Sequence, residues 1–288
     1  MKKLFCFGLG YSAEALARRL SPAEWQITGT ARSDDGVERI AALGYGAIRF
    51  DGHSPAPEAT DALADATHVL ISASPDELGD PVLRLHGGDL ANAASLGWIG
   101  YLSTIGVYGN SDGQWIDETA TPKPGVQRTK RRLEAEADWL TFAETHGKRV
   151  QVFRLGGIYG PGRSAIDDLR DGTARRIVKP GQVFNRIHVD DIATVLLAAA
   201  NGAGRHTIYN VTDDEPSPSQ DVIAYAADLM GLEPPPEIPF EQAELTPMGR
   251  SFYADNRRVS NRRLHDDLGV TLRFPTYREG MAGIFAGT

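Results

Sequence analysis

The chain has 288 residues and a formal net charge of −8, and this length permits one or two domains with a large buried core. The negative charge argues against sequence-independent nucleic-acid binding, which needs clustered positive charge. No apolar run reaches the roughly 18 residues of a membrane span, and a strand beginning at the third residue leaves no room for a signal peptide. The single cysteine, Cys6, cannot form an internal disulfide, and the seven histidines show no metal-ligand spacing, so we expect a cytoplasmic protein without a metal, a membrane or a nucleic acid as partner.

The first stretch of the chain has the pattern of a dinucleotide site. Segment 3–7 (KLFCF) predicts a buried strand, and the apolar residues at 13, 16, 17 and 20 have helical spacing. Between them, residues 8–13 fit G-x-G-x-x-A: Gly8 allows a tight turn, Gly10 lets a pyrophosphate approach the backbone, and Ala13 lets helix and strand pack closely. The phosphates would lie at the helix N-terminus, beside Tyr11 and Ser12.

The second strand is predicted over 25–31 and is followed by Arg32 and Ser33. An NAD site carries an acidic residue here, which binds the ribose 2′-hydroxyl, whereas an arginine suits a 2′-phosphate. We therefore predict NADP rather than NAD as the cofactor. We interpret the following Asp34 and Asp35 as N-cap residues of a helix over 36–43.

The third strand is predicted over 46–50 and ends in Asp51-Gly52. A polar residue at this strand end is placed to touch an adenine, and an aspartate before a glycine is also typical of a capped turn. Both interpretations of Asp51 are open at this point.

The fourth strand is predicted over 67–72, so that Ser72 and Ala73 would lie along the cofactor near the carboxyl ends of the strands. Residues 80–96 predict a helix that Gly87-Gly88 interrupts.

The fifth strand, predicted over 98–102, is followed by STIGVYG at 103–109. The alternation of strands and helices predicts an α/β fold with a doubly wound parallel sheet. STIGVYG resembles the S-[ST]-x-x-V-Y-G signature of the extended short-chain dehydrogenase/reductase family, also called NAD-dependent epimerase/dehydratases. Three later segments resemble the same family in the same order: FRLGGIYGPGR at 153–163, RIHVDDIA at 186–193 and YNVTDDEP at 209–216.

This resemblance implies an NAD(P)-binding Rossmann fold with a smaller C-terminal substrate lobe. The implied Rossmann domain comprises 1–163 and 188–212, and the implied lobe comprises 164–187 and 213–288. Family members often dimerise through a four-helix arrangement, which here would use 80–96 and the basic helix 128–144. The positive charges on that helix make such packing awkward, so a monomer and a homodimer both stay open.

The family's catalytic pattern is incomplete in this chain. The family uses a serine or threonine together with Tyr-x-x-x-Lys, a set suited to acid–base chemistry on a carbonyl or hydroxyl. Thr104 matches the hydroxyl position and Lys130 stands at a plausible lysine position, where it would orient the cofactor ribose. Four residues before Lys130 stands Val126, and no tyrosine occurs between Tyr108 and Tyr159.

Two tyrosines could replace the missing phenol. Tyr108 would do so if its loop bends over the nicotinamide, but we favour a packing role for it. Tyr159 has the same two interpretations.

Basic residues cluster at 128–132 (RTKRR), where they either bind an anion or form a solvated helix face. We expect at least one of them to point inward, because Leu133, Ala137 and Leu140 predict the buried stripe of this helix.

Two arginines of the second half are candidates for substrate contact. Arg163 follows the sixth strand and has a solvent-facing interpretation beside the functional one. Arg186 is a lobe residue whose guanidinium suits phosphate or carboxylate, whereas we expect His188 to be structural. Together these features predict an NADP-binding enzyme that acts by hydride transfer on a small or nucleotide-linked substrate. The alternative is a catalytically inactive NADP-binding sensor or partner-binding module.

Overall fold

The structure, a computed structural model, describes residues 1–287. Contacts divide the chain into two compact units. The first unit comprises 1–104, 126–154 and 192–209, and the second unit comprises the remaining segments. Segment 105–125 therefore belongs to the second unit, whereas the predicted boundaries place it in the Rossmann domain. Within residues 1–287, no helix combines the length and the apolar character needed to cross a membrane.

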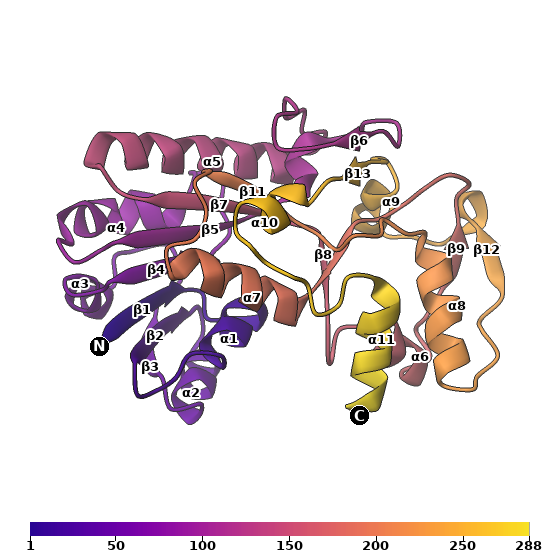
Figure 1. Ribbon diagram of the computed structural model, residues 1–288, viewed down its shortest axis with the longest axis horizontal. Helices are drawn as coiled ribbons and strands as arrows, with labels where there is room; N and C mark the ends of the chain where they lie inside the picture. Colours follow the sequence, from indigo (N-terminus) through magenta and orange to yellow (C-terminus); the bar gives the residue numbers. More distant parts are fainter. Residues whose placement is uncertain (288) are drawn as a thin grey trace. The chain divides into compact units, whose positions relative to one another are not determined.

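The first unit is built on a seven-stranded sheet with the strand order β11-β7-β5-β4-β1-β2-β3 (Figure 1). Strand pairing is parallel from β5 through β4, β1 and β2 to β3. The strands are β1 (Lys2–Phe7), β2 (Trp25–Ala31), β3 (Gly46–Arg49), β4 (His68–Ile71), β5 (Trp98–Thr104), β7 (Val150–Leu155) and β11 (Ile208–Val211). This topology confirms the predicted doubly wound α/β sheet.

Helices cover both faces of this sheet (Figure 1). The helices are α1 (Tyr11–Ala17), α2 (Asp34–Ala42), α3 (Pro57–Leu63), α4 (Pro81–Asn92), α5 (Gln127–His146) and α7 (Val189–Ala200), of which the last begins in the second unit. On one face, α3, α4 and α5 bury apolar side chains against the sheet, with Trp139 of α5 fully buried beside Tyr101 of β5. On the other face, Arg19 donates a hydrogen bond to Thr194 of α7 at 2.5 Å.

Two local predictions for these helices are wrong. The N-cap of α2 is Ser33, whose Oγ accepts from the Gly36 N–H, while Asp34 and Asp35 lie in the first turn. Helix α4 continues through Gly87-Gly88, where the sequence predicts an interruption. Asp80 caps its N-terminus and its buried face packs on the sheet, and both contacts stabilise the helix. A glycine costs a helix only about 1 kcal/mol, which such packing offsets.

The second unit contains a helical core and three short parallel strand pairs. Its helices α6 (Ala165–Arg170), α8 (Ser219–Leu229) and α11 (Tyr277–Ala286) bury a shared apolar cluster. The paired strands are β8 (Gly157–Tyr159) with β10 (Arg186–His188), β9 (Arg176–Val178) with β12 (Glu237–Pro239), and β6 (Trp115–Ile116) with β13 (Arg258–Val259). The smaller elements are η1 (Ile105–Tyr108), η2 (Phe240–Gln242), α9 (Pro247–Phe252) and α10 (Arg262–Asp266).

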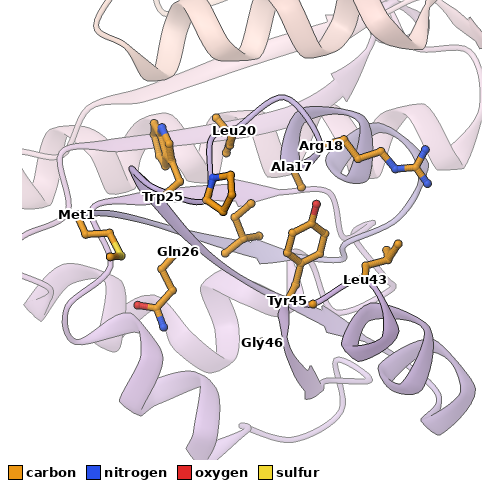
Figure 2. A pocket seen from close by; sticks show the side chains of 12 residues that line it. Met1, Ala17, Arg18, Leu20, Trp25, Gln26, Leu43, Tyr45 and Gly46 are labelled. Atoms are coloured by element: carbon orange, nitrogen blue, oxygen red, sulfur yellow. The ribbon is translucent and has the colours of Figure 1, made fainter.

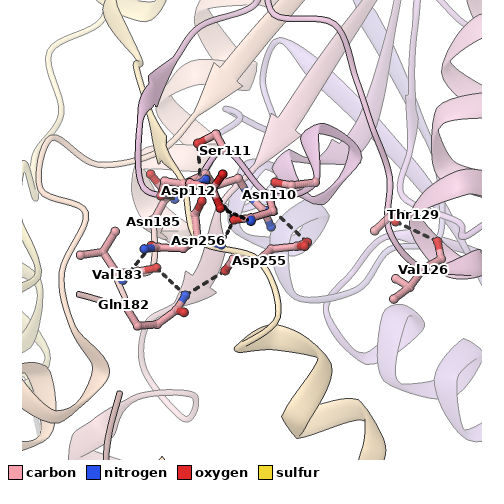
Figure 3. Close-up of polar contacts among 12 residues, drawn as sticks. Asn110, Ser111, Asp112, Val126, Thr129, Gln182, Val183, Asn185, Asp255 and Asn256 are labelled. Carbon is pink, nitrogen blue, oxygen red and sulfur yellow. Dashed lines mark hydrogen bonds and ion pairs between the residues drawn. The ribbon is translucent and has the colours of Figure 1, made fainter. Parts of the chain in front are cut away.

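Polar contacts join three distant segments of the second unit around Asn256 (Figure 3). The Asn256 N–H donates to Asn110 Oδ1 at 2.8 Å, and its Oδ1 accepts from the Val183 N–H at 3.2 Å. Asn185 accepts from the Val259 N–H at 2.8 Å and donates to the Arg257 carbonyl at 3.0 Å. The segment around Arg257 therefore holds the fold of this unit together.

Candidate functional site

The glycine turn after β1 has the geometry that a phosphate site needs. Gly8 adopts a φ of +86°, and its N–H donates to Thr30 Oγ1 at 2.9 Å. A Cβ on Gly10 would have no atom of the described residues within 4 Å, so the space above this backbone is open. Ser12 and Ala13 are buried in the first turn of α1, while Tyr11 is partly exposed. The sequence-predicted residues of this loop thus form a backbone surface that a phosphate group can approach.

This turn lies where the strand order of the sheet reverses. Strand β1 pairs with β2 on one side and β4 on the other. The Ser72 and Ala73 N–H groups both donate to the Phe7 carbonyl, at 2.9 and 3.0 Å. A Cβ on Gly8 would come within 3.3 Å of the Ala73 nitrogen. Ligands of open α/β sheets bind at such switch points, outside the carboxyl ends of the strands.

Arg32 follows β2 beside this turn and is exposed. Its guanidinium makes no hydrogen bond or ion pair with any residue in the described range 1–287. The neighbouring Asp34 carboxylate pairs with Arg49 at 3.0 Å. This ion pair offsets the negative charge of Asp34, which follows Arg32 by two positions.

Sequence reasoning missed the residues that support the glycine turn from α2. Arg39 Nη2 donates to the Leu9 carbonyl at 2.6 Å, and Nη1 of the same guanidinium pairs with Glu14 of α1. The contact joins residues 30 positions apart, and no motif in the sequence marks it.

Asp51 and Gly52 form a turn after β3. Asp51 Oδ1 accepts from the His53 N–H at 2.9 Å, and this hydrogen bond holds the pKa of the carboxyl below its usual range. Gly52 has a φ of +87°, and its carbonyl accepts from Arg84 at 2.8 Å. The turn-capping interpretation of Asp51 is therefore confirmed, and its contact with an adenine stays a prediction.

The residues of the incomplete catalytic pattern lie on β5 and α5. Thr104 is the last residue of β5 and is half-buried. Val126 precedes α5 at the N-cap position, is 39% exposed, and its carbonyl accepts from Thr129 Oγ1 at 2.9 Å (Figure 3). The Lys130 side chain is exposed and makes no hydrogen bond or ion pair with another described residue, while its backbone N–H donates to the Val126 carbonyl at 3.1 Å.

The predicted buried stripe of α5 is wrong. Ala137 is exposed, while Leu133 and Leu140 are only half-buried. The buried residues of this helix are Thr129, Ala135, Glu136, Trp139 and Phe142. One basic residue, Arg132, points inward as expected, and Arg131 pairs with Glu77 at 2.9 Å on the surface.

A buried ion pair that contacts Ser103, between Glu136 of α5 and Arg154 of β7, explains this helical phase. Glu136 and Arg154 are 2% and 3% exposed, and Arg154 Nη2 donates to Glu136 Oε2 at 2.6 Å. Arg154 Nε donates to both carboxylate oxygens at 3.1 and 3.2 Å, and Ser103 Oγ donates to Oε1. Glu136 therefore holds the residue directly before Thr104.

The remaining predicted residues lie in the second unit. The Tyr108 hydroxyl is buried and donates to Asn210 Oδ1 at 2.8 Å, as expected for a packing residue. Tyr159 is also buried, and burial raises its pKa. Arg163 is exposed, so its contact with a substrate stays a prediction. His188 is buried, and its Nδ1 accepts from the Asp190 N–H at 3.1 Å, which suits a structural role.

Arg186 lies among polar and aromatic groups of the second unit. Its Nη1 donates to the Phe184 and Ser217 carbonyls at 3.1 and 2.9 Å. Asp213 is 1% exposed, and burial raises its pKa well above the usual range although the positive charge of Arg186 acts in the opposite direction. The guanidinium is thus held in place by the carbonyls of Phe184 and Ser217, which form an isolated β-bridge.

A cavity of about 540 Å³ lies elsewhere in the first unit (Figure 2). Trp25, Gln26 and Gly46 line it from the beginnings of β2 and β3, and Arg18 and Leu43 line it from the ends of α1 and α2. It therefore opens at the amino-terminal edge of the strands, opposite the edge that carries the glycine turn.

Comparison with known proteins gives relatives over the full chain length, although no family model matches the chain. Protein YeeZ of Escherichia coli is 30% identical over 96% of this chain and 97% of its own length. A solved structure described as an NAD-dependent epimerase/dehydratase from Methylobacillus flagellatus is 28% identical, with a TM-score of 0.72 over 99% of this chain and 98% of that one. The chain belongs to the extended short-chain dehydrogenase/reductase family.

Three further matches are similar to this chain. A protein of unknown function from Silicibacter pomeroyi is 47% identical, with a TM-score of 0.90 over 100% of this chain and 99% of that one. A 3-diazoavenalumate denitrifying reductase from Streptomyces is 28% identical over 58% of both chains. UDP-glucuronic acid 4-epimerase from Bacillus cereus, in complex with UDP-glucuronic acid and NAD, shares the fold with a TM-score of 0.78 at 15% identity over 99% of this chain and 98% of that one.

Proposed function

We propose that this protein is an NADP-dependent oxidoreductase that acts on a small or nucleotide-linked substrate. One observation carries the choice of NADP: Arg32 follows β2 with a guanidinium that no described residue binds, while Arg49 pairs with the acidic neighbour Asp34. A guanidinium at this position gives a 2′-phosphate two charge-assisted hydrogen bonds. The open backbone at Gly10 supports a pyrophosphate in the same crevice.

The residues of the first unit then have separate roles. A bound dihydronicotinamide would supply hydride to the substrate. With a carbonyl substrate, Thr104 at the carboxyl end of β5 donates a hydrogen bond to the reacting oxygen. Its neighbour Ser103 is fixed by a hydrogen bond to Glu136, which keeps Thr104 in position.

The absence of a tyrosine between Tyr108 and Tyr159 favours acceptors that need no proton from a phenol. The Streptomyces relative is described as a reductase of a diazo compound, and an aryl diazonium ion carries its own positive charge. Such ions therefore join ketones, aldehydes and UDP-4-ketohexoses as candidate hydride acceptors for this chain.

The first test is a calorimetric titration of the wild-type protein with NADP, NADPH, NAD and NADH. We expect selective binding of NADP and NADPH. In Arg32→Ala that binding should weaken by roughly 10- to 100-fold, the equivalent of a charge-assisted hydrogen bond or two. Arg262→Ala, which removes an exposed arginine of α10, is the matched control and should change nothing. Equal affinity for NAD and NADP in the wild type would contradict the proposal.

A catalytically inactive sensor or partner-binding module is the second candidate, favoured by Val126 at the usual tyrosine position. NADPH oxidation, measured with aryl diazonium ions, with simple ketones and aldehydes, and with UDP-4-ketohexoses, separates the two functions. Turnover that Thr104→Ala abolishes would exclude the sensor. NADPH binding without turnover of any class would favour it.

A further inference from the structure

The basic residue on the inward face of α5 is Arg132. The family resemblance instead implies Lys130 as the residue that orients the cofactor ribose. Thr129, Arg132 and Glu136 are three and four residues apart, so they share one face of the helix. Thr129 and Glu136 are buried, and Arg132 is half-buried between them. Lys130 lies on another face, where it is exposed.

The Arg132 guanidinium joins the carboxyl ends of two neighbouring strands. Its Nη1 donates to the Leu102 carbonyl at 3.0 Å and to the Tyr101 hydroxyl at 3.1 Å, both on β5. The same Nη1 lies 3.5 Å from the Ala73 carbonyl, and Nη2 donates to Ser74 Oγ at 3.1 Å in the loop after β4.

That loop is part of the crevice described above. The Ala73 N–H donates to the carbonyl of Phe7, directly before the glycine turn. Arg132 therefore reaches the crevice on its β4–β5 side, while Arg32 lies on its β2 side. A dinucleotide bound across such a crevice has its two halves on opposite sides of the switch point.

The guanidinium has donors beyond those that hold the loop. It carries five N–H groups in a fixed planar arrangement. Within residues 1–287, Nε and one N–H of Nη2 make no hydrogen bond. Nε and Nη2 are both bonded to Cζ in one plane, so the spacing of their N–H groups suits the two hydroxyls of a ribose.

We propose that Arg132, and not Lys130, contacts the nicotinamide-side ribose of the bound dinucleotide. The inference rests on the proposed cofactor function and names a residue that the family pattern does not predict. A guanidinium stays charged throughout the accessible pH range, so its contribution to cofactor binding does not change with pH. The contribution of a lysine would decline at high pH, because its ammonium group loses a proton.

The experiment compares two ligands that differ in the nicotinamide half. NADPH contains both halves of the dinucleotide, whereas adenosine 2′,5′-bisphosphate contains only the half that Arg32 would bind. Both are titrated calorimetrically into the wild type, Arg132→Met, Arg132→Lys and the matched control Lys130→Met. Thermal unfolding of each variant reports whether it is folded.

We expect Arg132→Met to bind NADPH roughly 10- to 100-fold more weakly and to bind the bisphosphate within about 2-fold of the wild type. Arg132→Lys should recover part of the loss near neutral pH and lose that recovery as the pH approaches 10. Lys130→Met should bind both ligands as the wild type does. In one additional variant, Arg132→Ala, guanidinium ion at sub-denaturing concentration should restore NADPH binding.

Three outcomes would overturn the inference. A larger loss in Lys130→Met than in Arg132→Met would return the role to Lys130. An equal loss of both ligands in Arg132→Met would show that Arg132 acts through the fold of the loop. A wild type that binds neither ligand would contradict the proposed function itself, whereas wild-type binding that Arg132→Met leaves unchanged would contradict this inference alone.

Discussion

The ion pair between Glu136 and Arg154 offers the sharpest test of how the first unit is held together. Both side chains are at most 3% exposed, and three hydrogen bonds of 2.6 to 3.2 Å join them. Replacing Glu136 with methionine leaves the arginine charge buried without a partner. Such losses cost about 3–5 kcal/mol, because the desolvation of the remaining charge is no longer offset.

The assay is urea unfolding followed by tryptophan fluorescence, with a thermal scan in parallel. Trp98 and Trp139 are buried in the first unit and report on its unfolding. At about 2–4 °C per kcal/mol for a unit of this size, Glu136→Met should lower the midpoint by roughly 6–20 °C. Arg131→Met, which removes one partner of a surface ion pair, is the control and should cost under about 1 kcal/mol.

The double variant Glu136→Met/Arg154→Met decides the reasoning. With both charges removed, apolar side chains of similar length fill the space, so the double variant should lie within about 1 kcal/mol of the wild type. A double variant as unstable as the single ones would show that packing, and not the unpaired charge, sets the cost. A Glu136→Met cost below about 1 kcal/mol would refute the buried pair altogether.

Three further predictions concern other buried positions. A Cβ on Gly280 would come within 2.0 Å of the Tyr159 hydroxyl, so Gly280→Ala should lower the free energy of unfolding by about 1–3 kcal/mol. Gly87 lies in open space on α4, so Gly87→Ala should raise the free energy of unfolding by about 0.5–1 kcal/mol. Denaturant titration compares the two variants, and equal effects would contradict the packing at Gly280. Asp80 caps α4 and burial raises its pKa, so the unfolded chain releases this proton at lower pH than the folded one and stability falls as pH rises above about 4. Asp80→Asn should keep the cap and make stability depend less steeply on pH in a series of thermal scans. Asp80→Ala should cost about 1–2 kcal/mol, because the cap is lost. An unchanged pH dependence in Asp80→Asn would show that other groups cause it. Burial raises the pKa of the Cys6 thiol to about 12, so Ellman's reagent should modify this thiol only in denaturant. Rapid modification of the native protein at pH 8 would contradict this prediction and show that β1 opens.

Much of the first unit was predictable from short-range patterns. A strand, a G-x-G-x-x-A turn and a helix need only about 20 consecutive residues, and β1, the glycine turn and α1 lie where that pattern predicts them. The place of Arg32 directly after β2 follows from the end of one strand. Such features depend on local conformational preference and on the spacing of apolar residues, both of which can be read along the chain.

The phase of α5 depended on the tertiary structure. The apolar residues Leu133, Ala137 and Leu140 predict one buried face, but the helix is rotated so that Glu136 is buried and Ala137 is exposed. A carboxylate can be buried only when a partner offsets its desolvation, and that partner, Arg154, lies on a different element, β7. The same rotation brings Arg132 to the ends of β4 and β5 and leaves Lys130 exposed. Hydrophobic periodicity carries no information about a charge pair formed between two elements, so only the assembled sheet and helix decide which basic residue faces the crevice.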